Sequence, residues 1–250
     1  MDRNTKIRNV LMPVLFCLAW ALIGNTIVGM ASNVRGTIIT DMIVIMTTVP
    51  CYYYCFKSTT VKSVKDSVLP ITVVYLVLIW TLTQGIGTYV IQYDNRISDV
   101  VIDVDDIGLY YILTLVIAPI FEEFLMRGIF YTCYKSFTGI FGASLATSFI
   151  FGLLHGTLTQ GIIGFFAGIM FCFIFEATDN IWMCVLMHSL YNFLTVVLTP
   201  QIPCGFWTVI LHSTCLVILL LAYYVRYALD GSRGALSCPN LRQKCVNDKL

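Results

Sequence analysis

Charged and imidazole side chains occur inside apolar segments of this sequence, where such groups are rare. Glu122, Glu123 and Arg127 lie within the long apolar stretch IGLYYILTLVIAPIFEEFLMRGIFYTCY. Two of the chain's three histidines, His155 and His188, follow in equally apolar surroundings. A charge at membrane depth costs about 2.5–3.5 kcal/mol even on lenient insertion scales, so residues retained there are expected to serve a function. We therefore take these five residues as the first candidates for chemistry.

Helical geometry separates the two glutamates. Successive residues of a helix are about 100° apart, so Glu122 and Glu123 cannot face the same point. Glu123 and Arg127 are four residues apart, which places them on one helix face and predicts an ion pair. Glu122 is then left without a local counter-charge in a low-dielectric setting, which suits a general base. We expect Glu122 to take part in chemistry and the other two to support the packing of helices.

The remaining polar residues recur at the same helical spacing. Phe151 and His155 are four residues apart, and so are His188 and Asn192. Residues at this spacing lie on one face of a helix, so each pair is expected to face one place.

The expected depths of these residues agree. A turn near residues 136–139 would make an antiparallel hairpin, in which Glu122 and His155 lie at nearly the same level. At about 1.5 Å per residue, His188 returns to within about one helical turn of His155. Small residues would let the two intervening helices approach closely. These small residues are Gly152, Gly156 and the run from Gly164 to Gly168.

The composition predicts that these helices lie in a membrane. Hydrophobic residues make up 58% of the 250 residues and charged residues only 12%, against about 25% charged in an average soluble protein. A bilayer core about 30 Å thick needs about 20 apolar residues of helix. We predict an all-α membrane protein, a bundle of about eight transmembrane helices forming one domain over residues 1–250. The expected spans are 10–31, 38–56, 68–92, 108–135, 140–156, 160–176, 181–199 and 206–229.

Basic residues predict the orientation of the chain. With the N-terminus in the cytoplasm, thirteen of the fifteen lysines and arginines lie on the inner side, and only Arg35 and Arg96 lie outside. The positive-inside rule then predicts that both termini are cytoplasmic. The net charge of +1 gives no reason to expect a nucleic acid partner. The ten cysteines form no CxxC pair, and we expect them to pack as small hydrophobic residues.

Three motifs follow one another along the chain. They are EEFLMR at residues 122–127, FGLLH at residues 151–155 and HSLYN at residues 188–192. Together they resemble the EExxxR, FxxxH and HxxxN/D motifs of the CAAX protease and bacteriocin-processing (CPBP or Abi) family of intramembrane proteases, which includes proteins linked to bacteriocin processing and immunity. The resemblance is close over residues 108–199, and elsewhere it rests on the architecture alone.

The resemblance implies an intramembrane endopeptidase that hydrolyses peptide bonds of membrane-associated proteins or peptides. The implied roles are water activation by Glu122 and His155, oxyanion stabilisation by His188 and Asn192, and support by Glu123, Arg127 and Phe151. These roles agree with the chemistry of the residues, because a carboxylate and an imidazole can share proton transfer. Amide and imidazole donors suit a developing negative charge where water is scarce.

The same family has also been described as metalloproteases, since two histidines and a glutamate are a ligand set of hydrolytic zinc sites. In that case Glu122, His155 and His188 would hold a divalent metal, with zinc as the first choice. The chain has no HExxH motif, and these ligands would come from three separate helices. We therefore favour catalysis without a metal or other cofactor and keep the zinc site as the alternative.

A non-proteolytic function is the alternative from another class. The bundle would then be a membrane scaffold or immunity protein that regulates a membrane partner such as a sensor kinase. A scaffold has no need of Glu122, His155 and His188 at one level, which favours the enzyme. The partners expected of the enzyme are membrane lipid and a peptide or membrane-protein substrate. The compact chain resembles the bacterial branch of the family, so we expect it to be a multi-pass protein of the bacterial plasma membrane.

Overall fold

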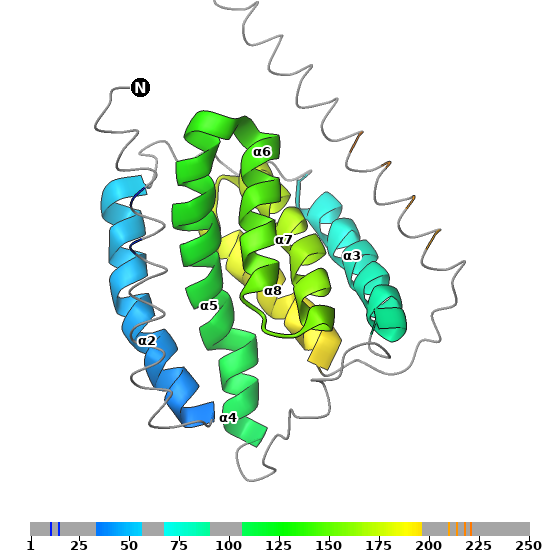
Figure 1. Ribbon diagram of the computed structural model, residues 1–250, viewed down its shortest axis with the longest axis horizontal. Coiled ribbons are helices and arrows are strands. Elements are labelled where there is room, and N and C mark those ends of the chain that lie inside the picture. The colour runs from blue at the N-terminus through cyan, green and yellow to red at the C-terminus, as the bar shows by residue number, and fades with distance from the viewer. Residues whose placement is uncertain are drawn as a thin grey trace, which may run out of the picture.

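The structure is a computed structural model that describes residues 34–56, 68–90 and 107–196, together with the isolated residues 11, 15, 210, 214, 218 and 221. All regular structure in these ranges is helical (Figure 1). The predicted all-α class is therefore confirmed for this part of the chain. The expected spans 10–31 and 206–229 and both termini fall almost wholly outside the described residues, so the number of spans and their orientation stay predictions.

The first described helices follow the predicted segments closely. Helix α2 (Val34–Cys51) continues into a π-helical turn, η1 (Tyr52–Phe56), and covers the expected span 38–56. Helix α3 (Val68–Val90) covers the expected span 68–92. In Figure 1 these two helices lie on opposite sides of the bundle, with the later helices between them.

The segment that carries the two glutamates is one long helix containing π-helical turns. Its parts are α4 (Ile107–Ile112), η5 (Leu113–Ile117), α5 (Ala118–Glu123), η6 (Phe124–Tyr131) and the first residues of α6 (Thr132–Leu153). Within α6, Gly139 has φ 74° and ψ −179°, and the chain reverses there (Figure 1). Glycine adopts this conformation readily because it has no Cβ. The turn predicted near residues 136–139 is therefore confirmed.

Two further apolar helices complete the described bundle. Helix α7 (Leu158–Thr178) begins after Thr157, whose side chain accepts a hydrogen bond from the Gln160 backbone N–H at 3.2 Å. It ends at Asp179, which has the left-handed conformation common at helix C-termini. Helix α8 (Ile181–Val196) follows directly. The chain breaks predicted at Thr157 and around Asp179 are thus confirmed.

The helix predicted over residues 140–156 ends early. Helix α6 stops at Leu153, and His155 lies in the turn that leads to α7. Gly156 has φ 76°, a value that residues with a Cβ rarely adopt, so it allows the turn. The expectation that Gly156 would permit close helix packing is wrong, because a Cβ there would meet nothing within 4 Å. His155 is therefore presented by a turn and not by a helix face.

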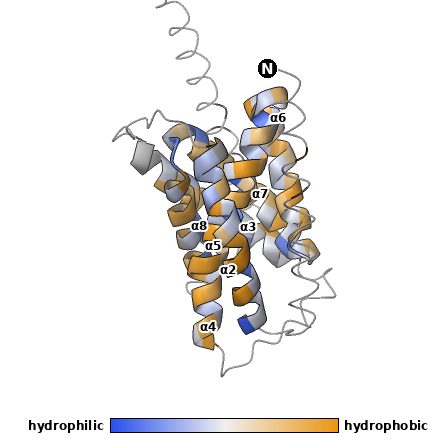
Figure 2. Ribbon diagram, turned by 90° about the vertical axis from the view of Figure 1, so that its left-hand side faces the viewer, coloured by the Kyte–Doolittle hydropathy of each residue, from blue (hydrophilic) through white to orange (hydrophobic). Residues whose placement is uncertain are grey.

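The exposed surface suits a lipid environment. By length and composition, three helices among the described residues are able to cross a membrane: Val34–Tyr54, Ile107–Leu153, which reverses at Gly139, and Leu158–Thr178. Hydrophobic residues occur along most of the length of the described helices (Figure 2). Large apolar side chains such as Met46 and Phe149 are exposed. These features support an integral membrane protein.

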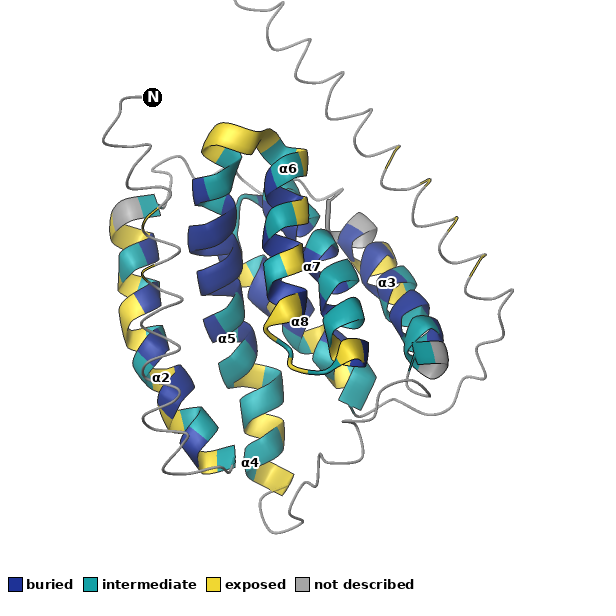
Figure 3. Ribbon diagram, viewed as in Figure 1, coloured by how far each residue is buried: buried dark blue, intermediate teal, exposed yellow. Residues whose placement is uncertain are grey.

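The buried apolar core has two parts. The larger part lies among α3, α7 and α8 and includes Ile79, Phe171 and Met187. The smaller part joins α2 to η6 and α6 and includes Val44 and Phe151. Figure 3 shows buried residues gathered where the helices of the bundle face one another. Two buried thiols, Cys172 and Cys184, are free and lie within the larger part, so the packing role predicted for cysteines is confirmed for them.

Glycines bring α6 and α7 into close contact. A Cβ added at Gly152 would lie 2.5 Å from the carbonyl oxygen of Gly161, and one added at Gly168 would lie 3.0 Å from the Ser148 side chain. A Cβ at Gly164 would lie 3.2 Å from the ring of the histidine in the α6–α7 turn. The close approach predicted from these glycines is confirmed, and it holds that turn against α7.

We predict that Gly152→Ala lowers the stability of the folded protein by about 1–3 kcal/mol, because the added methyl group collides with backbone that cannot yield unless α6 and α7 separate. Gly108→Ala is the matched control, since a Cβ at this α4 position would meet nothing within 4 Å. Its melting temperature should stay the same or rise slightly. Thermal unfolding in one detergent compares the two variants, and equal melting temperatures would contradict the close backbone contact.

Candidate active site

Side chains from four parts of the bundle meet at one place. Glu122 and Glu123 come from α5, Arg127 from η6, His155 from the turn after α6 and His188 from α8. Three of these side chains are buried, whereas Glu122 and His155 are partly exposed. The two neighbouring glutamates therefore differ in their access to solvent, as the 100° separation on a helix predicts.

The predicted ion pair between Glu123 and Arg127 is present. Arg127 Nη1 donates to Glu123 Oε1 at 3.0 Å, and both side chains are fully buried. The second guanidinium nitrogen, Nη2, donates to the Gly168 carbonyl oxygen in α7 at 2.9 Å. The guanidinium also lies 5.0 Å from the ring centroid of Phe151 and 5.2 Å from that of Phe171, one ring from each part of the core. Arg127 thus connects η6 with α6 and α7.

His188 lies between the two glutamates. Its Nδ1 is 2.7 Å from Glu123 Oε1, and its Nε2 is 3.6 Å from Glu122 Oε2. A carboxylate paired with an arginine only accepts hydrogen bonds, so Nδ1 carries the hydrogen. Phe171 stacks on the imidazole with ring centroids 4.6 Å apart and an interplanar angle of 23°. The contact between Glu123 and His188 could not be read from the sequence, because spacing relates only residues of the same helix.

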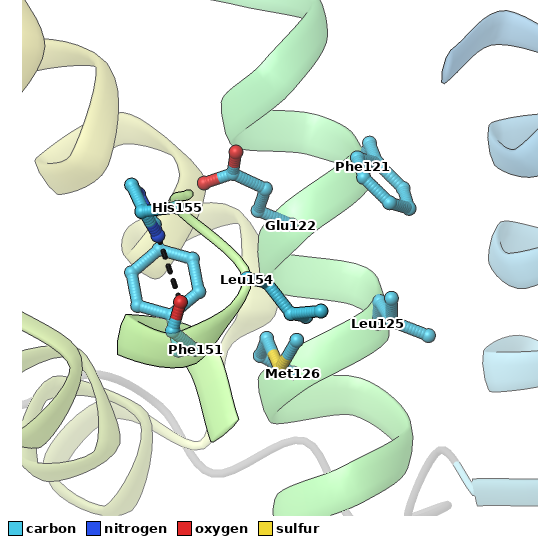
Figure 4. Close-up of a pocket in the computed structure, with 7 residues that line it drawn as sticks. All are labelled: Phe121, Glu122, Leu125, Met126, Phe151, Leu154 and His155. Carbon is cyan, nitrogen blue, oxygen red and sulfur yellow. Dashed lines mark hydrogen bonds between the residues drawn. The ribbon is translucent and has the colours of Figure 1, made fainter. Parts of the chain in front are cut away.

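Glu122 and His155 line one pocket (Figure 4). The pocket has a volume of about 200 Å³, and its other lining residues are Phe121, Leu125, Met126, Phe151 and Leu154. His155 Nδ1 lies 2.7 Å from the Phe151 carbonyl oxygen, which only accepts, so in the neutral ring Nε2 keeps the lone pair. In Figure 4 the Glu122 carboxylate points toward the His155 ring. Two proton acceptors therefore share a small apolar pocket.

Asn192 is held by the backbone of the glutamate-bearing helix. Its Nδ2 donates to the Thr114 carbonyl oxygen in η5 at 2.8 Å. A primary amide has two N–H groups, so one donor remains for another partner. The sequence paired Asn192 with His188 through helical spacing and gave no sign of this contact. Its role in oxyanion stabilisation stays a prediction.

The residues of the alternative zinc mechanism do not form a ready ligand set. Within the described part of the chain, no group of three histidine, cysteine, aspartate or glutamate side chains is arranged to hold a metal ion. The alternative zinc site of Glu122, His155 and His188 stays a prediction, and we route no step through a metal.

Known proteins share the region that contains the site. Residues 106–194 match the family described as "Type II CAAX prenyl endopeptidase Rce1-like". All three motifs lie inside this match. The resemblance to the CAAX protease and bacteriocin-processing family is thereby confirmed over this region, which matches the Rce1-like family model. At the level of the family, the match supports a CAAX-type membrane protease.

A bacterial relative agrees with the family match. The Bacillus subtilis protein named "Putative membrane peptidase YdiL" is 26% identical over 172 residues, which cover 63% of this chain and 66% of the relative. The chain thus matches slightly less than two thirds of the length of that protein. No solved structure gives a significant match.

The central ion pair generates a stability prediction. Glu123→Gln and Arg127→Met should each cost about 3–5 kcal/mol, because each leaves the partner charge buried and unpaired. The double variant should cost clearly less than the sum of the two, since it leaves no unpaired charge. Thermal unfolding of the four proteins in detergent measures this coupling.

The pair of Lys135 and Glu176 provides a matched control cycle. It also joins α6 to α7, but the Lys135 side chain is 40% exposed, although that of Glu176 is only 9% exposed, so water screens the cation. Exposed ion pairs contribute about 0–1 kcal/mol, so Lys135→Met and Glu176→Gln should show little coupling. Additive losses for Glu123→Gln and Arg127→Met would contradict the buried pairing.

Proposed function

We propose that this protein is an intramembrane endopeptidase that hydrolyses peptide bonds of membrane-associated proteins or peptides. The observation that carries the proposal is that Glu122 and His155 line the same apolar pocket, with His188 Nε2 3.6 Å from Glu122. The Rce1-like match and the peptidase named among its relatives support the same reaction class. The function requires membrane lipid and a peptide or membrane-protein substrate as partners. The Bacillus subtilis relative supports a location in the bacterial plasma membrane.

Glu122 is the general base of this mechanism. Its side chain is 24% exposed, whereas that of Glu123 is 0% exposed, so only Glu122 meets a water molecule in the pocket. The carboxylate accepts a proton from this water while the water oxygen attacks the carbonyl carbon of the scissile bond. His155 Nε2 accepts a hydrogen bond from the same water and orients it. Glu122 then gives the proton to the leaving amine nitrogen, which returns the carboxylate to its starting state.

His188 and Asn192 stabilise the oxyanion. Glu123 holds His188 through Nδ1, which turns Nε2 toward Glu122. A donor at Nε2 requires the imidazolium form of His188, because Nδ1 already carries the hydrogen that faces Glu123. Nε2–H is then a charged donor for the oxyanion, and the second N–H of Asn192 is a neutral one. Fixed donors in a site that excludes water stabilise such a charge strongly.

The base is tested by Glu122→Gln, which keeps the shape of the side chain but cannot accept the proton. We expect turnover to fall about 10²–10⁴-fold with an unchanged melting temperature. Because the family description names CAAX prenyl endopeptidases, a prenylated C-terminal peptide is the first substrate to assay in proteoliposomes. An unmodified membrane peptide is the second.

Glu176→Gln is the matched control for this test, because Glu176 is paired with Lys135 and lies outside the pocket. It should keep nearly wild-type turnover. If Glu122→Gln also keeps wild-type turnover, Glu122 has no part in the mechanism, and the regulatory scaffold becomes the better explanation of the fold.

The proposal also predicts that no metal is needed. Metal-stripped protein should retain its rate, and active purified protein should contain less than one equivalent of bound metal by elemental analysis. The reason is that Glu122 and His155 share the pocket and can activate water by proton transfer alone. His212→Ala, which changes the histidine outside the three motifs, is the control for His188→Ala. A stoichiometric zinc that follows activity and is lost only in His188→Ala would replace the mechanism and leave the endopeptidase assignment intact.

A further inference from the structure

The helix before the two glutamates contains a carbonyl group whose regular backbone donor is missing. In the π-helical turn η5, the hydrogen bonds run five residues back, and the Ala118 N–H donates to the Leu113 carbonyl oxygen. The next donor in this register belongs to position 119 and would reach the Thr114 carbonyl oxygen. Position 119 is a buried proline, which has no N–H to donate. The Thr114 carbonyl is therefore open to a donor from elsewhere.

Asn192 supplies that donor from α8, which packs against η5 and α5. Its Nδ2 lies 2.8 Å from the Thr114 carbonyl oxygen. A carbonyl oxygen only accepts, so the amide must turn its nitrogen, and not its oxygen, toward η5. At membrane depth an unsatisfied backbone carbonyl costs several kcal/mol, which favours this one orientation of the amide.

We propose that Pro119 is a positioning residue that fixes the orientation of the Asn192 amide by keeping the Thr114 carbonyl available to it. The catalytic consequence rests on the proposed endopeptidase function. With one N–H held by Thr114, the second N–H of the planar amide has a defined direction and serves as the oxyanion donor. Pro119 lies three residues before Glu122. One proline thus links the position of the base on α5 to the orientation of a donor on α8.

Pro119→Ala tests the link because it returns an N–H that competes for the Thr114 carbonyl and releases Asn192. We expect kcat to fall about 10- to 100-fold, the range for a displaced catalytic donor, with KM unchanged. The melting temperature should stay the same or rise, since the helix gains a backbone hydrogen bond. Pro50→Ala is the matched control, because Pro50 is an exposed proline inside α2, and it should leave kcat unchanged.

A double-mutant cycle asks whether Pro119 acts through Asn192. In the Asn192→Ala background, Pro119→Ala should cause no further loss of kcat, because the donor it positions is gone. An unchanged kcat in Pro119→Ala alone would overturn the proposal. So would the same fold-loss in both backgrounds, since Pro119 would then act by another route.

A second cycle measures the same link without any assay of proteolysis. Asn192→Leu should lower the melting temperature when Pro119 is present, because Thr114 then loses its donor. The drop should be smaller in Pro119→Ala, whose backbone N–H can satisfy the carbonyl. An equal drop in both backgrounds overturns the link even if the protein is a protease, and a smaller drop supports it even if no substrate is cleaved. Failure of both Pro119→Ala and Pro119→Ser to fold would also overturn it, because each restores a helical hydrogen bond.

Discussion

The burial of Arg127 is the constraint on which the rest of this structure depends. A guanidinium removed from water must be compensated at short range, and leaving it unpaired costs about 3–5 kcal/mol. Its compensation comes from Glu123 on the same helix and from the Gly168 carbonyl on α7. Because α7 must approach closely to offer that carbonyl, the glycines at the α6–α7 contact follow from the same requirement. The buried Arg127 therefore requires both a partner carboxylate and the close packing of α6 against α7.

The burial of Arg127 also gives the two adjacent glutamates different environments. Glu123 is committed to Arg127 and to His188, and it is completely excluded from solvent. Glu122, one residue earlier, lines the pocket together with His155 and lies 3.6 Å from His188 Nε2. A motif with two consecutive glutamates thus encodes one fully buried carboxylate, which pairs with cations, and one partly exposed carboxylate, which lines the pocket. Neither could take the place of the other without turning the helix by about 100°.

Much of the bundle followed from periodicity and turn residues, but the contacts across it did not. The reversal at Gly139 and the cap at Thr157 were predictable because glycine and threonine have local conformational preferences. The pairing of Glu123 with Arg127 followed from helical spacing alone. Helical spacing relates only residues of the same helix. The hydrogen bond between His188 and Glu123, which are 65 residues apart on α8 and α5, could therefore not be predicted from the sequence.

One wrong expectation, about Gly156, and one feature not foreseen, at Pro119, had signals in the sequence. Gly156 follows His155 directly, and a glycine at the end of an apolar run often marks a helix terminus, yet the apolar pattern was extended through it. Pro119 lies inside an apolar helix and has no backbone N–H, which indicates that one helical hydrogen bond is missing. The partner that replaces it, Asn192, could not be named, because that choice depends on how α8 packs against η5. The preferences of single residues therefore indicate where the helical hydrogen bonding is interrupted. Which side chain replaces the missing donor depends on how the helices pack.

The early end of α6 has a consequence for the surrounding lipid. The limb from residue 140 to Leu153 is only about 21 Å long at 1.5 Å per residue, shorter than a hydrocarbon core of about 30 Å. The other limb, from Ile107 to the turn at Gly139, is roughly 48 Å long by the same rise. The two limbs of this hairpin thus differ in length, and a bilayer adapts to a span shorter than its core by thinning locally. A thinner leaflet beside the turn that bears His155 would shorten the path of water to the buried site.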